Sequence, residues 1–254
     1  MAVVQVKYRS EALVRNVIFD IYLPNDKPDE QGRPMKTLFL LHGYTGDAWN
    51  WVPEELSQKY NFAVVTPNGE NGFWLDGLST GHKYCTFVGE ELVDYLRRTF
   101  GLAMRKEDTC IMGLSMGGFG ALHTGLYYPE TFSKIGAMSS ALIMHEVAAM
   151  KEGADNGMAN YDYYRECFGE PAKLLASDNN PETLVDKLIA QHGNMPEIYM
   201  CCGTEDFLLE ENRSFHEFLC DRKVEHIYQE SKGEHDMNFW DGYTEKIVKW
   251  MFEE

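Results

Sequence analysis

The chain has 254 residues, 44% of them apolar and 25% charged, which is an ordinary composition for a globular protein with a sizeable core. Its 40 acidic residues outnumber the 23 basic ones and give a net charge of −17 at pH 7. Such a surplus repels nucleic-acid phosphates and anionic lipids, so we expect neither nucleic acid nor a membrane surface as a partner. We also expect no membrane span, because no apolar run reaches the required length of roughly 18 residues. We expect no signal peptide, because the N-terminal segment has no long apolar core and no small-residue cleavage site.

The cysteine pattern indicates reduced thiols and no structural metal. None of the six cysteines forms a CxxC pair or has the spacing of a zinc finger. Several lie in apolar runs, where a reduced cysteine packs as a small hydrophobic side chain. We therefore expect a cytoplasmic protein, because that compartment keeps thiols reduced. The six are Cys85, Cys110, Cys167, Cys201, Cys202 and Cys220.

Two partly alternating segments open the chain, at residues 3–8 and 14–23, and Pro24 ends the second. This pattern predicts an antiparallel pair of strands at a sheet edge. Short continuous apolar runs follow, and such runs are typical of strands buried on both faces, as in a parallel sheet. The runs cover residues 37–41, 62–65, 109–114, 135–138 and 198–202.

Helical patterns between these runs predict an α/β fold. Val88, Leu92 and Leu96 share one helix face, and Tyr243 and Ile247 repeat the spacing near the C-terminus. Strands that alternate with helices form a mostly parallel, twisted sheet that is flanked by helices.

We expect one domain, residues 1–254, with residues 142–195 as a modest cap-like insertion. This second range is polar and irregular, and it contains an aromatic cluster between residues 161 and 168. It is too long for an ordinary connection, which favours local helices or a cap. A surface excursion with a small core of its own is the other interpretation.

The segment GLSMGG, residues 113–118, predicts a nucleophilic serine. Its GxSxG pattern follows a strand-like run and precedes a helix-like one. The tight turn at such a junction needs residues without side chains two positions before and after Ser115, and Gly113 and Gly117 meet that need. The turn strains the serine backbone and projects its hydroxyl away from the sheet. The amide of Met116 then points from the helix N-terminus towards a developing negative charge.

A serine hydroxyl is a weak nucleophile, so we expect an acid and a base further along the chain. His235 lies in a polar loop between the last strand and the last helix, whereas His216 and His226 fit packing or surface positions. Asp206 follows an apolar run, and catalytic groups of open α/β sheets gather at the carboxyl ends of strands. Glu205 is the alternative acid, and a loop or capping carboxylate is the other interpretation of Asp206.

The loop after the first buried strand predicts a second donor for an oxyanion. In the segment LFLLHGYTG, Gly43 lets the backbone approach a substrate closely, and the amide of Tyr44 would be the donor. We expect His42 to hold this turn by hydrogen bonds rather than to act as a base.

Together these motifs resemble the esterase D-like branch of the α/β-hydrolases. The likeness is strongest to tributyrin/acetyl esterases and to feruloyl and cinnamoyl esterases. The branch also contains S-formylglutathione hydrolases, whose typical pattern around the oxyanion loop is not present here. The matching segments are LLHGYTGDAWNW (40–51), TPNGENGFWLD (66–76), GLSMGGFGAL (113–122), CGTEDFLLEENRSF (202–215) and GEHDMNFWD (233–241).

This resemblance implies an α/β-hydrolase fold and a serine carboxylesterase. The implied substrates are esters of short or aromatic acids, such as acetyl, butyryl and hydroxycinnamoyl esters, including carbohydrate-linked ones. The implied roles are nucleophile for Ser115, acid for Asp206 and base for His235, with oxyanion amides at Tyr44 and Met116. No metal or organic cofactor is implied, and a homo-oligomer is compatible with the family.

The resemblance also places the loop at residues 66–76, with Trp74, near the substrate, and Trp240 would line the same site. Plain packing is the other interpretation of both tryptophans. A thioesterase like S-formylglutathione hydrolase, an acyltransferase or a peptidase could use the same three residues. A binding protein without catalysis is less favoured because all three candidates occur in order. A metal site of His235, Asp236 and Asp206 matches no known ligand spacing.

Overall fold

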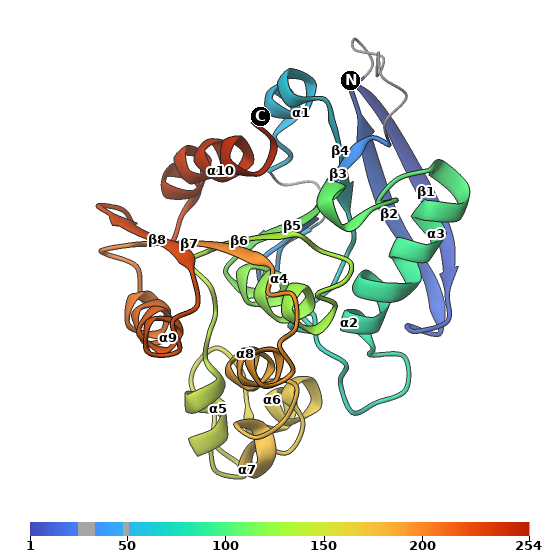
Figure 1. The fold of residues 1–254 in the computed structure, drawn as a ribbon. Coiled ribbons are helices and arrows are strands. Elements are labelled where there is room, and N and C mark those ends of the chain that lie inside the picture. Colours follow the sequence, from blue (N-terminus) through green and yellow to red (C-terminus); the bar gives the residue numbers. More distant parts are fainter. Residues whose placement is uncertain (25–33, 48–50, 254) are drawn as a thin grey trace.

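A hairpin of β1 (Ala2–Ser10) and β2 (Arg15–Leu23) forms one edge of the sheet in the computed structural model, which describes residues 1–24, 34–47 and 51–253 (Figure 1). The further strands are β3 (Lys36–Leu41), β4 (Phe62–Thr66), β5 (Thr109–Leu114), β6 (Lys134–Met138), β7 (Glu197–Gly203) and β8 (His226–Ser231). They form an eight-stranded sheet in the order β1-β2-β4-β3-β5-β6-β7-β8. β2 pairs antiparallel with β4, and every later pair is parallel. The expected antiparallel edge and mostly parallel sheet are confirmed.

Helices cover both faces of this sheet (Figure 1). The face with α1 (Glu54–Tyr60) also carries α10 (Met237–Phe252). The opposite face carries α4 (Met116–Tyr127), α9 (Leu209–Asp221) and α3 (Leu92–Phe100). A short helix α2 (Tyr84–Thr86) and a π-helical turn (Phe87–Glu91) lead directly into α3, and a 3₁₀ turn (Lys106–Asp108) precedes β5.

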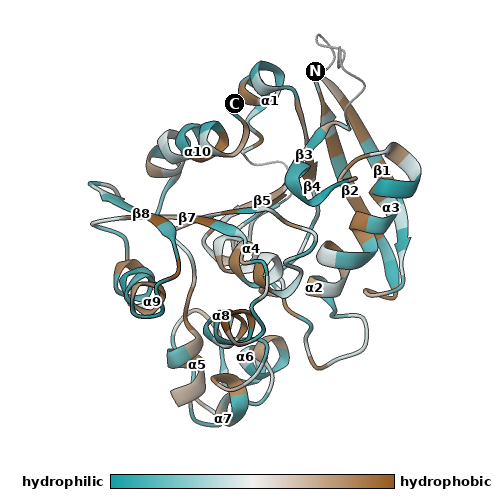
Figure 2. Cartoon of the chain, in the orientation of Figure 1, coloured by the Kyte–Doolittle hydropathy of each residue, from teal (hydrophilic) through white to brown (hydrophobic). Residues whose placement is uncertain are grey.

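The continuous apolar runs arise because both faces of the central strands are buried. Along β3, Leu38 and Leu40 pack under α1 and α10, while Phe39 and Leu41 pack under α4. Successive side chains of a strand point to opposite faces, so each face demands apolar residues at every second position. Figure 2 shows hydrophobic residues along the central strands and a mixture of both colours on outer helices such as α3. Among the described residues, no helix has both the length and the apolar character to cross a membrane.

The region at residues 142–195 contains local helices beside α4. These are α5 (Met144–Ala149), α6 (Tyr161–Phe168), α7 (Pro171–Leu174) and α8 (Pro181–Ala190). They gather at one end of the molecule, where α8 packs on α4 (Figure 1). The aromatic cluster lies on α6, with Tyr164 and Phe168 turned into the core. The description of this range as a cap within a single domain stays a prediction.

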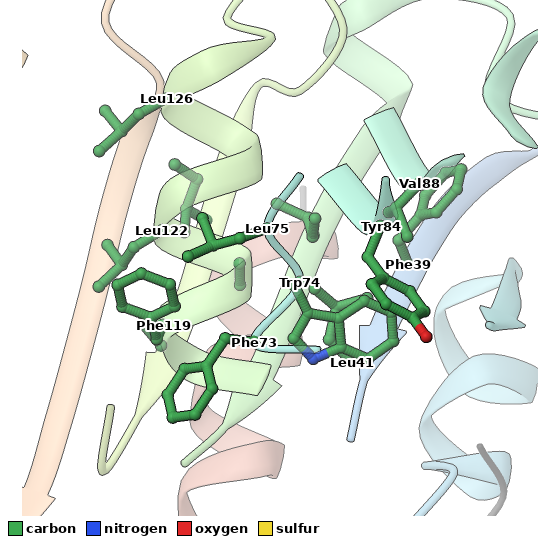
Figure 3. Close-up of a cluster of buried hydrophobic side chains, with 14 of the residues drawn as sticks. Phe39, Leu41, Phe73, Trp74, Leu75, Tyr84, Val88, Phe119, Leu122 and Leu126 are labelled. Atoms are coloured by element: carbon green, nitrogen blue, oxygen red, sulfur yellow. The ribbon is translucent and has the colours of Figure 1, made fainter. Parts of the chain in front are cut away.

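Trp74 is the largest fully buried side chain and lies at the centre of the packing around α4 (Figure 3). Phe73 and Trp74 both have positive φ, 51° and 57°, and this turn buries the indole with Leu41 and Tyr84. The indole fits against α4 only because position 120 is glycine, since a Cβ there would lie 2.4 Å from its ring. The buried loop thus depends on a small residue in the helix.

The same glycine-to-alanine change should have opposite effects at two helical positions. In Gly120→Ala the added methyl collides with the ring of Trp74 near its attachment point, and overpacking of this kind costs about 1–3 kcal/mol. In Gly242→Ala, on α10, nothing lies within 4 Å of the new methyl. Alanine should stabilise that helix by about 0.8–1 kcal/mol, because it restricts the unfolded chain more than glycine does. Urea denaturation of both variants measures the signs, and a stabilised Gly120→Ala would contradict the packing described here.

Candidate active site

Ser115 lies on the turn between β5 and α4 in a backbone conformation that few residues adopt, with φ 54° and ψ −121°. The turn is closed by glycines on both sides. A Cβ at Gly113 would lie 2.1 Å from the carbonyl oxygen of Gly117, and one at Gly117 would lie 2.1 Å from that of Leu41. Backbone strain of this kind persists only where surrounding structure holds it, and it is concentrated at functional sites.

A continuous chain of hydrogen bonds joins Ser115, His235 and Asp206. His235 Nε2 lies 2.9 Å from Ser115 Oγ, and His235 Nδ1 lies 3.0 and 2.9 Å from the two carboxylate oxygens of Asp206. The carboxylate can only accept, so Nδ1 carries the ring proton and Nε2 is left to accept the serine proton. Such an arrangement can draw the proton from the hydroxyl as the oxygen attacks a carbonyl carbon.

Asp206 lies in a buried and well-bonded environment. Its side chain has no exposed surface, whereas that of His235 keeps 17% exposed. Burial by itself would raise the pKa of Asp206, but the hydrogen bonds from His235 and from the Leu208 N–H lower it. With the hydrogen bond of Ser139, these bonds outweigh burial, so the pKa of Asp206 lies below its ordinary value. The carboxylate is therefore ionised at neutral pH.

Trp240 is linked to the Asp206 carboxylate through Ser139. Its indole Nε1–H donates to Ser139 Oγ at 3.0 Å, and that hydroxyl is a hydrogen-bond partner of Asp206. The indole also contacts the ring of His235 edge-on, with the ring centres 4.8 Å apart. Trp240 is 8% exposed and is absent from the lining of the cavity beside Ser115. The structure therefore places it beside the imidazole and the acid.

The alternative acid and histidines lie elsewhere. The exposed Glu205 carboxylate faces Lys232 at 4.0 Å, away from the imidazole. His216 and His226 contact each other on α9 and β8. Asp236 caps α10 by accepting a hydrogen bond from the Phe239 N–H, so its carboxylate does not join Asp206 and His235.

Two backbone N–H groups near Ser115 are available to a ligand. The amides of Tyr44 and Met116 have no hydrogen-bond acceptor among the residues that the structure describes. Met116 is the first residue of α4, where N–H groups point along the helix axis without a partner. Gly43 brings the first loop close, since a Cβ at this position would lie 3.0 Å from Leu114 and 3.4 Å from Ser115. Residues 48–50 of the segment LLHGYTGDAWNW (40–51) lie outside the described residues.

His42 ties two loops together. Its Nδ1 lies 2.8 Å from the carbonyl oxygen of Gly43, and its Nε2 accepts from the Gly69 N–H at 2.9 Å. Burial lowers the pKa of His42, which favours the neutral ring, and the two hydrogen bonds place its proton on Nδ1. Trp74 Nε1–H donates to the His42 carbonyl at 3.2 Å. The loop at residues 66–76 is thus fastened to the loop that carries Tyr44.

A cavity of about 250 Å³ opens beside Ser115 and is walled mostly by apolar and aromatic side chains. Two of them stand at an exposed rim, Phe207 at 67% and Met158 at 60% exposure, and the Phe207 ring lies 4.5 Å from that of His235. Two carboxylates, Glu146 and Glu211, also face the cavity. The remaining lining residues are Tyr44, Phe73, Met116, Ala141, Ile143, Asn156, Tyr163, Tyr164 and Leu208.

The cavity lining differs from the expected substrate-binding residues. Trp74 is fully buried behind the site, and its neighbour Phe73 is the side chain that faces the cavity. Sequence reasoning missed Phe73, and it also missed Phe207 directly after the acid. The aromatic cluster on α6 was a usable signal, because Tyr163 and Tyr164 reach the cavity from it.

Comparison with known proteins agrees with this fold and family. The profile of the Esterase family matches residues 10–250. An acetyl esterase from Caldicellulosiruptor saccharolyticus is 41% identical over 99% of this chain and 98% of its own length. A fluorophosphonate-binding serine hydrolase from Staphylococcus aureus superposes with a TM-score of 0.86 at 24% identity, over 100% of this chain and 99% of the other. An S-formylglutathione hydrolase from Staphylococcus aureus does so with a TM-score of 0.84 at 25% identity, over 99% of both chains.

The family profile covers most of the chain, and the relative at 41% identity spans nearly all of it. The parallel sheet and flanking helices are those of an α/β-hydrolase, as expected. The chain therefore belongs to the Esterase family of α/β-hydrolases and is a carboxylic ester hydrolase.

Proposed function

We propose that this chain is a serine esterase for uncharged esters of short or aromatic acids, and that Ser115, His235 and Asp206 are its catalytic residues. The observation that carries the proposal is the unbroken hydrogen-bond chain from a strained serine to a buried carboxylate. The serine opens directly into the apolar cavity.

The reaction follows from these contacts. His235 Nε2 takes the proton from Ser115 Oγ as the oxygen attacks the ester carbonyl. The free amides of Tyr44 and Met116 stabilise the oxyanion that forms, and donors of this kind contribute about 3–4 kcal/mol each. The imidazolium then protonates the leaving alcohol, and water releases the acid from the acyl-enzyme by the same route. Asp206 stays ionised and holds the imidazole in the required tautomer.

The cavity limits the size and charge of the acyl group. A space of about 250 Å³ with aromatic walls accommodates an acetyl, butyryl or hydroxycinnamoyl group, and a long fatty acyl chain would extend out of it. The 41% identity to an acetyl esterase supports acetyl esters, including acetylated carbohydrates, as the first substrates to test.

A thioesterase acting on S-formylglutathione is the second candidate, and the structural similarity to such an enzyme supports it. The two carboxylates that face the cavity favour an uncharged ester over S-formylglutathione. Glutathione carries two carboxylates, and Glu146 and Glu211 would repel them. An acyltransferase would use the same three residues with an alcohol in place of water, so adding a sugar acceptor to the assay distinguishes it.

Ser115→Ala should abolish hydrolysis of p-nitrophenyl acetate, with a loss of about 10⁶-fold in kcat because the nucleophile is gone. Labelling by a fluorophosphonate should disappear in the same variant. Ser177→Ala, at a partly exposed serine after α7, is the matched control and should keep wild-type activity. Retained activity or labelling in folded Ser115→Ala would disprove the assignment.

Asp206→Asn should lower kcat by about 10⁴-fold, since the amide no longer holds the productive tautomer. The variant should also change how stability depends on pH. Folding lowers the pKa of Asp206, so its ionised form stabilises the fold above the unfolded pKa of about 3.9. This contribution disappears as the pH falls through the lower folded pKa, so the stability gap to wild type should shrink in acid.

Chemical denaturation from pH 7 down to pH 3 measures that gap. Glu205→Gln is the control, because its carboxylate is exposed and faces a lysine. If Glu205→Gln lost activity and Asp206→Asn kept it, Glu205 rather than Asp206 would be the catalytic acid.

Glu211→Gln should raise kcat/KM for S-formylglutathione relative to p-nitrophenyl acetate by about two- to fivefold, since one partly exposed charge is worth up to about 1 kcal/mol. Glu217→Gln, exposed further along α9 and outside the cavity, should leave the ratio unchanged. An unchanged ratio in Glu211→Gln would remove charge as the basis for choosing between ester and thioester.

A further inference from the structure

Three potential metal ligands meet where α9 lies beside β8. His216 and Cys220 are one turn apart on α9, and His226 is the first residue of β8. His216 Nδ1 lies 2.7 Å from His226 Nε2, and Cys220 Sγ lies 3.7 Å from His216 Nδ1. All three ligand atoms fall within 4.8 Å of one another. Ser115 follows the carboxyl end of β5, whereas this cluster lies at the amino end of β8. Because the strands from β5 to β8 are parallel, the two sites lie at opposite ends of the strands.

The hydrogen bonds prepare His226 as a ligand. Its Nδ1 lies 2.8 Å from the carbonyl oxygen of Val224, which can only accept, so the proton is on Nδ1. Nε2 therefore presents its lone pair to His216 and Cys220. Histidine ligands in metal sites usually donate their second ring N–H to a carbonyl or carboxylate in this way.

The distances are close to those of a tetrahedral zinc site. Zinc binds imidazole nitrogen at about 2.0–2.1 Å and thiolate sulfur at about 2.3 Å, which places two nitrogens about 3.3 Å apart and a nitrogen and a sulfur about 3.6 Å apart. Cys220 Sγ is already near that separation from His216 Nδ1, at 3.7 Å. The two nitrogens need to move apart by about half an ångström, which small side-chain rotations supply at this partly exposed site.

The surroundings carry charges of both signs. Glu217 and Glu230 lie close enough to act on the charge of His216, and Arg213 pairs with Glu230 through two hydrogen bonds of 2.8 Å. The ring of Tyr228 stacks on His216 with the ring centres 4.4 Å apart. A fourth position faces solvent beside the exposed Cys220 and can be filled by water.

We propose that His216, Cys220 and His226 form a binding site for a zinc ion, with water as the fourth ligand. On binding, the thiol of Cys220 releases its proton to solvent, and the shared proton of His216 moves from Nδ1 to Nε2. The ion then connects α9 to β8. α9 begins shortly after Asp206, and β8 ends shortly before His235, so zinc would brace the two elements that precede and follow these residues in the chain.

Reaction with a thiol reagent tests the site in the intact protein. Cys220 is the exposed cysteine among six free thiols, so the native, chelator-treated protein should show one fast-reacting thiol. One equivalent of Zn²⁺ should slow this reaction at least tenfold, and excess chelator should restore it. His226→Gln should keep the fast thiol but lose the protection, whereas His192→Gln, at an exposed histidine outside the cluster, should behave as wild type.

Two further measurements show whether the sulfur is a ligand. Co²⁺ in place of Zn²⁺ should give a thiolate-to-metal charge-transfer band and tetrahedral d–d bands, all absent in Cys220→Ser. Zinc at a hundredfold excess over its Kd should raise Tm by about 5–10 °C in wild type and not in Cys220→Ser. Fluorophosphonate labelling of Ser115 provides a separate check, because it tests the proposed esterase site and is independent of zinc. If Cys220 reacts equally fast with and without Zn²⁺, or if Cys220→Ser binds the metal as tightly as wild type, the site does not exist.

Discussion

The close contact between the start of α4 and the end of β3 is the constraint on which the site depends. A side chain at Gly117 would overlap the carbonyl oxygens of Leu41 and His42, so the helix can begin here only without one. Because β3 and β5 are neighbouring parallel strands, this contact brings the loop after β3 against the turn after β5. The serine and the amides of Tyr44 and Met116, which have no acceptor among the described residues, are therefore positioned by backbone packing.

The proposed acid and base are positioned differently. Asp206 follows β7 and His235 follows β8, and hydrogen bonds to side chains hold them in place. The hydrogen bond between His235 Nδ1 and the Asp206 carboxylate joins the two. The Leu208 N–H and Ser139 also bond to the carboxylate, and Trp240 donates to Ser139. A buried carboxylate with several donors is rigid, and rigidity of the acid is what fixes the imidazole.

The sheet was predictable from the sequence because burial on both faces leaves a direct trace, a short run without polar residues. β8 illustrates the limit: none of its residues is fully buried, so it has no continuous apolar run to mark it. The turn from strand to helix at the serine was equally predictable, because no residue with a side chain fits at Gly113 or Gly117. The position of Trp74 was harder to predict, because it lies in a turn of two successive residues with positive φ and packs against a glycine of α4. The cavity walls and the histidine–cysteine cluster required tertiary contacts between α6, α9 and β8 that no local pattern encodes.

The order in which these pieces occur along the chain has a consequence for the protein's synthesis. Ser115 and its strained turn belong to β5 and α4, and α4 ends at Tyr127, the midpoint of the 254 residues. The partner histidine comes 120 residues later, and the indole that supports the acid lies in α10. A nascent chain thus carries Ser115 through the addition of 120 further residues before His235 is present. The hydrogen-bond chain from Ser115 to Asp206 can therefore form only after His235 has been added, late in synthesis.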